Sequence, residues 1–258
     1  MEPPIPKRVV ITGASSGIGA ALARAYAAQG AALGLIARRE TELKRLAAQL
    51  GGNCSVYALD VRDADALRRA AVDFIARHGC PDVVIANAGV SLGTLTEYPA
   101  DAQVFQDVID INVMGAVKTF QPFVAGMREA GGGALVGIAS VAGYRGLPGA
   151  AAYSASKAAV ISCLESLRVE LRASGIKVIT ICPGYIATPM TEHNPYPMPF
   201  IMSADTAANR IISIVERGKT YAVIPWQMAL VARLLRVLPN WVYDRLFARA
   251  PRKQRHAD

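Results

Sequence analysis

The most restrictive feature of this sequence lies close to its N-terminus. Residues 7–12 hold a short β-branched run, which is typical of a strand buried on both faces. A helical pattern covers residues 20–29, and the turn between the two reads Thr12-Gly13-Ala14-Ser15-Ser16-Gly17-Ile18-Gly19. A helix that begins directly after such a turn offers backbone N–H groups and the positive end of its dipole to an anion. The stretch therefore predicts an α/β chain that binds a phosphate-bearing ligand here.

The three glycines of this turn have separate uses in a dinucleotide site. Gly13 permits the tight turn, Gly17 lets the main chain approach a pyrophosphate, and Gly19 lets helix and strand pack closely. Their spacing is Gly-x-x-x-Gly-x-Gly rather than the common Gly-x-Gly-x-x-Gly. A purely structural glycine loop is the alternative. The position between a first strand and a helix favours nucleotide binding.

The end of the second predicted strand bears on the choice of cofactor. NAD-binding sites place an acidic residue there to bind the ribose 2′-hydroxyl. This chain has Arg38 and Arg39 after the apolar residues 31–37. An arginine binds phosphate through two hydrogen bonds, so the pair favours NADP(H). NAD(H) stays an alternative, because an arginine here can also begin the next helix on its solvent face.

Strand and helix patterns alternate along the rest of the chain. Further apolar strands are predicted at residues 54–60, 81–87, 134–139, 176–182 and 221–224, with helical patterns between them at 41–50, from 63, 101–128, 150–173 and 206–217. Such alternation with right-handed crossovers predicts one doubly wound Rossmann-type domain, in which seven parallel strands carry helices on both faces. We expect a core at 7–225 within a single domain of 258 residues.

A second group of polar residues surrounds the loop at 140–150. Ser140 ends the fifth strand, and Tyr153 and Lys157 lie one helical turn apart on the helix that follows. A nearby ammonium favours the phenolate, so we expect Lys157 to lower the pKa of Tyr153 towards the range of a general acid or base. Ser140 would hold the substrate oxygen. Taken alone, a Tyr-x-x-x-Lys pair is weak evidence, because some such pairs are exposed on the helix surface and contribute little.

Together these motifs resemble those of the short-chain dehydrogenases/reductases, over about residues 7–225. The resemblance depends on Thr12–Gly19, Asp60, Asn87-Ala88-Gly89, Asn112, Ser140, Tyr153 with Lys157, and Pro183-Gly184. The chain departs from the family at Ala86, where an asparagine is frequent.

The resemblance implies a role for each matching position. Asn112 would hold a water in a proton relay that passes through Lys157 to Tyr153, and Ser140 would polarise the carbonyl. Lys157 would also bind the nicotinamide ribose, and Asn87 would steady the central strand. Further cofactor contacts are implied for Asp60 and Val61 at the adenine, Ala88 and Gly89 beside it, and Pro183, Gly184, Ile186 and Thr188 at the nicotinamide. The implied reaction transfers hydride between the nicotinamide and a carbinol carbon, with reduction by NADPH as the default direction.

The segment at 184–205 is long and rich in proline and methionine, so we expect a lid over a lipophilic substrate. Tyr144, Tyr185 and Met190 are the candidate substrate contacts beside Ser140 and Tyr153. The alternative is an ordinary loop that packs back on the domain. Arg145 would bind an acidic substrate group or point to solvent. His193 is expected to be a surface residue rather than a catalyst.

Residues 226–258 form an amphipathic, basic extension that Pro239 divides into two short helices. We expect its apolar side to cover the substrate cleft or a subunit contact, with peripheral binding to an anionic membrane as the alternative. The last ten residues are predicted to be a solvated tail. We expect no nucleic-acid partner, although the net charge of +8 would suit one.

The remaining composition places the chain in the cytoplasm. No apolar run is long enough to span a membrane, no signal peptide is evident, and the four cysteines lack metal-ligand spacing and are expected to be buried free thiols. The favoured function is NADPH-dependent reduction of a hydrophobic ketone or aldehyde, in a homodimer or homotetramer paired through the helices of Asn112 and Tyr153. The alternatives are an NAD-dependent alcohol dehydrogenase and a non-catalytic NADP(H)-sensing or membrane-surface protein.

Overall fold

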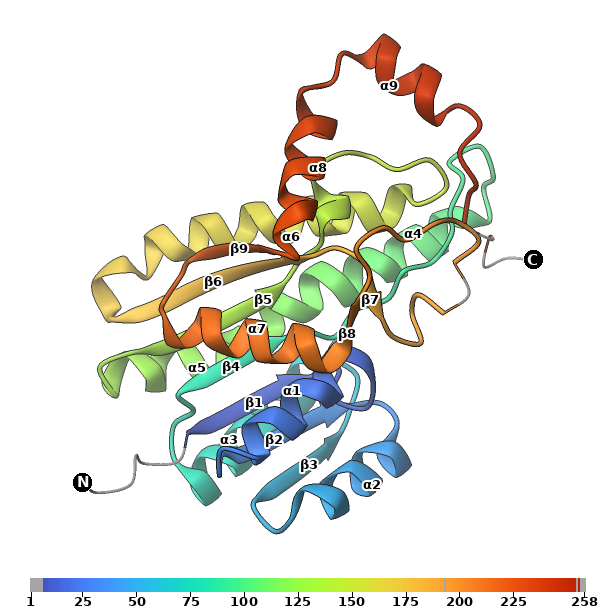
Figure 1. The fold of residues 1–258 in the computed structure, drawn as a ribbon. Coiled ribbons are helices and arrows are strands. Elements are labelled where there is room, and N and C mark those ends of the chain that lie inside the picture. Colours follow the sequence, from blue (N-terminus) through green and yellow to red (C-terminus); the bar gives the residue numbers. More distant parts are fainter. Residues whose placement is uncertain (1–6, 193, 254, 256–258) are drawn as a thin grey trace.

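Seven parallel strands form the central sheet of the computed structural model, which describes residues 7–192, 194–253 and 255. The strand order β3-β2-β1-β4-β5-β6-β9 confirms the predicted doubly wound sheet (Figure 1). Its direction of winding reverses between β1 and β4, where ligands bind in sheets of this kind. The strands are β1 (Arg8–Thr12), β2 (Ala32–Ala37), β3 (Cys54–Ala58), β4 (Val83–Ala86), β5 (Gly133–Ile138), β6 (Ile176–Pro183) and β9 (Tyr221–Ile224).

Helices cover both faces of this sheet, as the alternation predicts. One face carries α1 (Gly17–Ala27), α2 (Glu40–Leu50) and α7 (Ala204–Glu216). The other carries α3 (Ala64–His78), α5 (Gly115–Glu129) and α6 (Ala151–Glu170). The region predicted as one helix at 101–128 is α4 (Asp101–Ile109) and α5, joined by a π-helical turn at Asp110–Met114.

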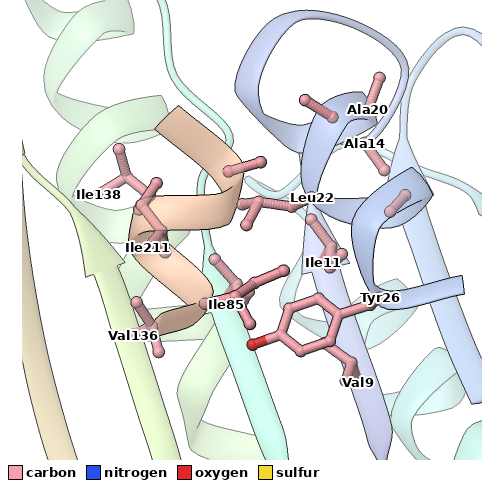
Figure 2. Packing of buried hydrophobic residues seen from close by; sticks show 14 of the residues in the cluster. Val9, Ile11, Ala14, Ala20, Leu22, Tyr26, Ile85, Val136, Ile138 and Ile211 are labelled. Carbon is pink, nitrogen blue, oxygen red and sulfur yellow. The ribbon is translucent and has the colours of Figure 1, made fainter. Parts of the chain in front are cut away.

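Successive residues of the inner strands face opposite layers of the core. Val9 and Ile11 of β1 pack under α1, whereas Val10 between them faces the other layer. In Figure 2, Tyr26 of α1 lies beside Val9, and Ile211 of α7 covers the β5 side of the same layer. All five side chains are almost completely buried. This is why the strands read as continuous apolar runs instead of alternating ones.

The segment at 184–205 contains two short strands that the sequence pattern did not predict. β7 (Ile186–Ala187) and β8 (Met202–Ser203) pair in parallel and tie the two ends of the segment together. Two-residue strands are too short for a periodic pattern to show. Ile186 and Met202 are buried, so part of the segment packs back on the domain. His193 lies outside the described residues.

The extension folds as two helices, α8 (Trp226–Val237) and α9 (Asn240–Phe247), with the predicted break at Pro239. Arg145 fixes them to the domain: its guanidinium donates to the carbonyl oxygens of Leu235 and Leu238, both at 2.7 Å, and lies 4.1 Å from the Tyr243 ring centroid. The expectation that Arg145 meets an acidic substrate or solvent is therefore wrong. The backbone carbonyls at the end of α8 occupy its hydrogen bonds.

The chain after α9 returns to the loop that follows β4 (Figure 1). Arg255 pairs with Asp101 at 3.0 Å, and Lys253 donates to the Ser91 hydroxyl at 3.1 Å. The prediction of a solvated tail is wrong at these two positions, because each charge has a polar partner on the domain. Residues 254 and 256–258 lie outside the described residues.

Two further observations concern the compartment. None of the helices in the described part of the chain is long and apolar enough to cross a membrane. All four cysteines are free, but Cys163 on α6 is exposed and only Cys182 is fully buried, so the expectation of buried thiols is wrong for Cys163.

Candidate active site

A cavity of about 380 Å³ opens at the carboxyl ends of β1, β2 and β4. Most of the predicted cofactor residues line it: Gly13, Ser15, Ser16, Gly17, Ile18, Arg38, Arg39, Asp60, Val61, Asn87, Ala88, Gly89 and Thr188. Gly19, Pro183, Gly184, Ile186, Tyr153 and Lys157 lie outside this cavity. The sheet brings these distant stretches together because parallel strands end at one edge.

The glycine turn has the shape that its spacing predicts. Gly13 and Gly17 have φ of 67° and 54°, a region that side chains disfavour. A Cβ on Gly13 would lie 2.9 Å from the Ala88 Cα, and one on Gly19 would lie 2.3 Å from the Gly13 carbonyl oxygen. Gly19 therefore lets the start of α1 pack against the turn, and Gly13 lets the turn approach Ala88 closely. Gly17 lines the cavity opposite the Thr188 side chain.

Asn87 joins the ends of β1 and β4 at this point. Its side-chain amide donates to the Thr12 carbonyl oxygen at 3.0 Å, and its backbone N–H donates to the Thr12 hydroxyl at 3.1 Å. The residue steadies the central strands where the winding of the sheet reverses.

Two arginines lie at the far side of the cavity. Arg39 donates to the hydroxyls of Ser15 and Ser16 at 3.0 and 2.8 Å, next to the start of α1. Arg38 is 3.9 Å from the Asp60 carboxylate and mostly exposed. Both guanidinium groups therefore reach the end of β2, where the 2′-position of an adenosine ribose lies in a dinucleotide fold.

The Asp60 carboxylate has a second cationic partner, because the Arg62 guanidinium lies 2.9 Å from it. No sequence motif indicates Arg62. Burial acts to raise the pKa of Asp60, but hydrogen bonds from Arg62 and the charge of Arg38 outweigh it, so the pKa lies below its ordinary value. The carboxylate is thus ionised at neutral pH and orients both arginines.

These features fit a pyridine dinucleotide. The glycine turn leaves room for a pyrophosphate at the N-terminus of α1, and the arginines supply positive charge at the ribose end. Asp60 and Val61, which the resemblance implies as adenine contacts, line the same cavity.

A second cavity, of about 290 Å³, adjoins the first through Met190, which lines both. Ser140, Tyr153, Gly184 and Tyr185 lie in its wall. Tyr144 does not: its hydroxyl lies 2.7 Å from that of Tyr221, on the α8 side of the sheet end. The structure therefore brings four of the five predicted substrate contacts together, with Met190 the link to the cofactor cavity.

Ser140 caps a short turn after β5. Its side-chain oxygen accepts from the Ala142 N–H at 3.1 Å, and its hydroxyl points to the Pro183 carbonyl oxygen at 3.5 Å. The side chain is buried at the wall of the cavity. This long, weak contact leaves the hydroxyl available to a substrate oxygen.

Lys157 is buried behind Tyr153. Its Nζ donates to the Ile138 carbonyl oxygen at 2.8 Å and lies 5.7 Å from the centroid of the Tyr153 ring. Burial lowers the pKa of Lys157 to about 8. The amine is still largely protonated at neutral pH.

The expected lowering of the Tyr153 pKa is not found in this structure. Burial raises the pKa of the phenol, and the Ser140 side chain opposes that shift without cancelling it. The ammonium of Lys157 is directed to the Ile138 carbonyl, so desolvation of Tyr153 prevails. Tyr153 therefore carries its proton at neutral pH, which is the form a proton donor needs.

The π-helical turn places Asn112 beside these groups. Its amide oxygen accepts from the Val90 N–H at 2.8 Å, and its amide nitrogen donates to the Val90 carbonyl and to Ser156. Gly89 lies between Asn112 and Lys157: a Cβ there would lie 3.1 Å from the Asn112 oxygen and 3.6 Å from the Lys157 Nζ. The two polar atoms thus approach each other across a glycine.

Several lining residues of the second cavity had no sequence signal of their own. Ser91 comes from the loop after β4, and Phe247, Ala250, Pro251 and Lys253 come from the C-terminal extension. The expectation that the extension covers the substrate cleft agrees with this arrangement, although the pattern could not say which residues face inward.

The family model for short chain dehydrogenases matches residues 7–197, about three quarters of the chain. The chain is a short-chain dehydrogenase/reductase. The family motifs stand at the positions just described, and the protein is an oxidoreductase with an NAD(P)-binding fold.

Relatives cover almost all of this short-chain dehydrogenase/reductase. An uncharacterised oxidoreductase of Myxococcus xanthus is 39% identical over 241 residues, which are 92% of this chain and 95% of the relative. A short-chain dehydrogenase from Streptomyces avermitilis has a TM-score of 0.79 at 28% identity, covering 94% of this chain and 98% of its own. The L-sorbose reductase from Gluconobacter frateurii, solved with NADPH and L-sorbose, has a TM-score of 0.77 at 28% identity. The match covers 87% of this chain and 97% of the reductase chain.

Proposed function

We propose that this enzyme reduces a lipophilic ketone or aldehyde to the alcohol with NADPH, or catalyses the reverse reaction. The observation that carries the proposal is the shared cavity of Ser140 and Tyr153, next to the dinucleotide cavity and backed by the buried Lys157. A hydroxyl donor and a protonated phenol in one apolar wall suit a carbonyl oxygen that gains a proton.

The chain's own residues supply the acid–base part of this reaction. The nicotinamide, when bound, supplies the hydride to the carbonyl carbon. Ser140 donates a hydrogen bond to the carbonyl oxygen and so favours the charge that develops there. Tyr153 gives its proton to that oxygen, and Lys157 stabilises the phenolate left behind. Asn112, close to Lys157 across Gly89, lies where a proton could return to the pair from water.

The wall of the second cavity supports a lipophilic substrate. Most of this wall is aliphatic or aromatic, with Leu147, Tyr185 and Phe247 among its larger side chains. No acidic side chain among the described residues lines it, and its one charged group is Lys253. A mostly apolar cavity with a few placed polar groups binds apolar surface and orients it through those groups.

A panel of ketones and aldehydes of rising chain length tests this proposal, with NADPH consumption and the alcohol product as readouts. We expect kcat/KM to rise with apolar surface, because burial of each methylene contributes about 0.8 kcal/mol. A panel in which no member is reduced, with no alcohol oxidised by NADP⁺, would contradict the proposed activity.

The preference for NADP(H) is supported by Arg38 and Arg39 at the ribose end of the cavity. Quenching of tryptophan fluorescence by each cofactor measures it. We expect NADPH to bind more tightly than NADH, and Arg38→Asp to reverse the order through repulsion of the 2′-phosphate. Equal affinities in the unmodified protein would favour the alternative of NAD-dependent alcohol oxidation.

A peripheral membrane contact is a second proposal, for which the exposed side of α8 and α9 gives support. Trp226, Leu234 and Trp241 are 65%, 60% and 74% exposed. Exposed arginines lie among them at positions 233, 236, 245 and 249. Tryptophan with arginine suits the surface of an anionic bilayer. We therefore expect a cytoplasmic enzyme that in part occupies such a surface.

Co-sedimentation with vesicles of phosphatidylcholine, with and without phosphatidylserine, tests the contact. We expect binding only to the anionic vesicles, and loss of it in a Trp226→Ser/Trp241→Ser variant. Equal recovery in the pellet with neutral vesicles, or no binding at all, would contradict the contact.

A homodimer or homotetramer is proposed through α5 and α6. A groove of about 390 Å³ lies between these helices, and its apolar lining includes Val117, Phe120 and Leu167. An apolar groove at the protein surface is typical of a protein interface.

A further inference from the structure

Lys253 is the one charged side chain among the described residues that line the substrate cavity. It belongs to the C-terminal extension, whereas Ser140 and Tyr153 come from the sheet and α6. Its only hydrogen bond within the described part of the chain is the one to the Ser91 hydroxyl, at 3.1 Å. A half-buried ammonium with a neutral partner retains capacity for an anion.

The extension holds Lys253 in this place from both sides. Before it, the Tyr243 hydroxyl donates to the Gly146 carbonyl oxygen. After it, Arg255 pairs with the buried Asp101 at 3.0 Å and lies 3.8 Å from the Tyr98 ring centroid. These contacts position the ammonium in the cavity wall, where a solvated terminal lysine would move freely.

The Ser91 hydroxyl is a second hydrogen-bond donor beside Lys253 in the cavity wall. Its hydroxyl oxygen accepts from Lys253, so its own hydrogen is directed elsewhere, and no partner for it is found in the described residues. Two donors whose heavy atoms are 3.1 Å apart can each reach one oxygen of a carboxylate. A single positive charge also suits a monoanion better than a phosphate dianion.

The environment of Lys253 is partly apolar and partly removed from solvent. Burial lowers the pKa of the Lys253 ammonium below its ordinary value. An anion bound beside it would offset the cost of burying the charge.

From this geometry we propose that the substrate is an oxo acid, or the corresponding hydroxy acid, whose carboxylate binds Lys253 and Ser91 while its carbonyl lies at Ser140 and Tyr153. The inference depends on the proposed function. It specifies the substrate class further, from any lipophilic carbonyl compound to one that also carries a carboxylate. The apolar wall holds the middle of the molecule, and the C-terminal extension supplies the charge.

Binding of an unreactive carboxylate tests this without turnover. We compare phenylbutanoate with phenylbutanamide, by calorimetry on the protein saturated with NADP⁺. A charge-assisted hydrogen bond predicts that the acid binds on the order of tenfold to a hundredfold more tightly than the amide. In Lys253→Met the ratio of the two affinities, acid over amide, should fall to about one. The acid then loses its ionic partner, whereas both ligands keep their apolar contacts.

Arg252→Met is the matched control. It removes a neighbouring, exposed cation that does not line the cavity, and the ratio should stay as in the unmodified protein. Lys253→Arg should retain most of the ratio, since it keeps the charge. Equal binding of acid and amide, or an unchanged ratio in Lys253→Met, would overturn the inference.

Turnover of benzoylpropanoate against benzoylpropanamide separates this inference from the proposed function. Reduction of both at equal kcat/KM would leave the reductase proposal in place and overturn the carboxylate site. Selective binding of phenylbutanoate without reduction of either ketone would support the carboxylate site and contradict the reductase.

Discussion

At the scale of single residues, the proposed chemistry depends on the partly buried Tyr153 and the buried Lys157 behind it. The two side chains lie on one face of α6, as their spacing predicts. Burial, which the spacing does not reveal, moves both pKa values towards the neutral forms. The pair was predictable as a contact, but its electrostatics depend on the packing of β5 and α6 around it.

The lowered pKa of Lys157 makes a prediction about stability. Its pKa is about 8 in the folded protein, whereas an unfolded lysine titrates near 10.4. Between these values the unfolded chain binds more protons, so this group's contribution to the free energy of unfolding rises with pH, by on the order of 3 kcal/mol in total.

Urea unfolding of the cofactor-free protein and of Lys157→Met at pH 7 to 10.5 measures this contribution. At pH 7 we expect Lys157→Met to have a larger free energy of unfolding than the unmodified protein. This difference should shrink as the pH rises. A constant difference over this interval would show that Lys157 is not desolvated as the structure indicates.

At the scale of elements, the seven strands and the glycine turn were predictable because each has a strong local signal. Residues 7–12 are rich in apolar β-branched side chains, and Gly13 and Gly17 lie where the chain needs a positive φ. β7 and β8 were not predictable, since two residues carry no period. The inward side of the extension was not predictable either, because Arg145 and Asp101 fix it through contacts distant in sequence.

Gly13→Ala tests the turn between β1 and α1. The new Cβ would lie 2.9 Å from the Ala88 Cα at a φ of 67°, so we expect a loss of roughly 2–4 kcal/mol in the free energy of unfolding. Gly52→Ala is the control, since nothing lies within 4 Å of its added Cβ. Thermal unfolding of both variants measures the effect, and equal stability of the two would contradict the described turn.

Asp101→Asn tests the attachment of the C-terminal extension. Arg255 and the Leu95 N–H lower the pKa of Asp101, so this carboxylate stabilises the fold above its ordinary pKa and ceases to do so as the pH falls through its lower folded value. We expect trypsin to cut after Arg249 and Arg252 faster in the variant at neutral pH. Glu40→Gln, which removes an exposed pair with Lys44, should leave the rate unchanged; equal rates in the two variants would contradict the attachment.

At the scale of the whole molecule, a segment that follows the last strand of the sheet forms part of the wall of the second cavity, the proposed substrate site. Phe247 and Lys253 of this segment line the same cavity as Ser91 and Ser140, which lie far earlier in the sequence. Motifs located the cofactor cavity because its residues follow strands in a fixed order. The second cavity, the proposed substrate site, is lined in part by a loop and by the extension, and only the folded chain brings these segments together.

Leu167→Arg tests the proposed assembly. Leu167 lines the groove between α5 and α6, and a charge there would oppose burial of this face against a second copy. Light scattering after gel filtration should show a smaller species than the unmodified protein forms. Arg68→Ala on α3, away from the groove, is the control. An unchanged assembly in Leu167→Arg would contradict pairing through this face.

The proposed mechanism depends above all on Tyr153 giving its proton to a carbonyl held in the second cavity. Single-turnover oxidation of bound NADPH by a reducible ketone, in the unmodified protein and in Tyr153→Phe, measures this step. We predict a loss of about 10²- to 10⁴-fold in the rate with the affinity for NADPH retained, because only the proton donor is removed. A Tyr153→Phe variant that reduces the ketone at the unmodified rate would contradict this role for Tyr153.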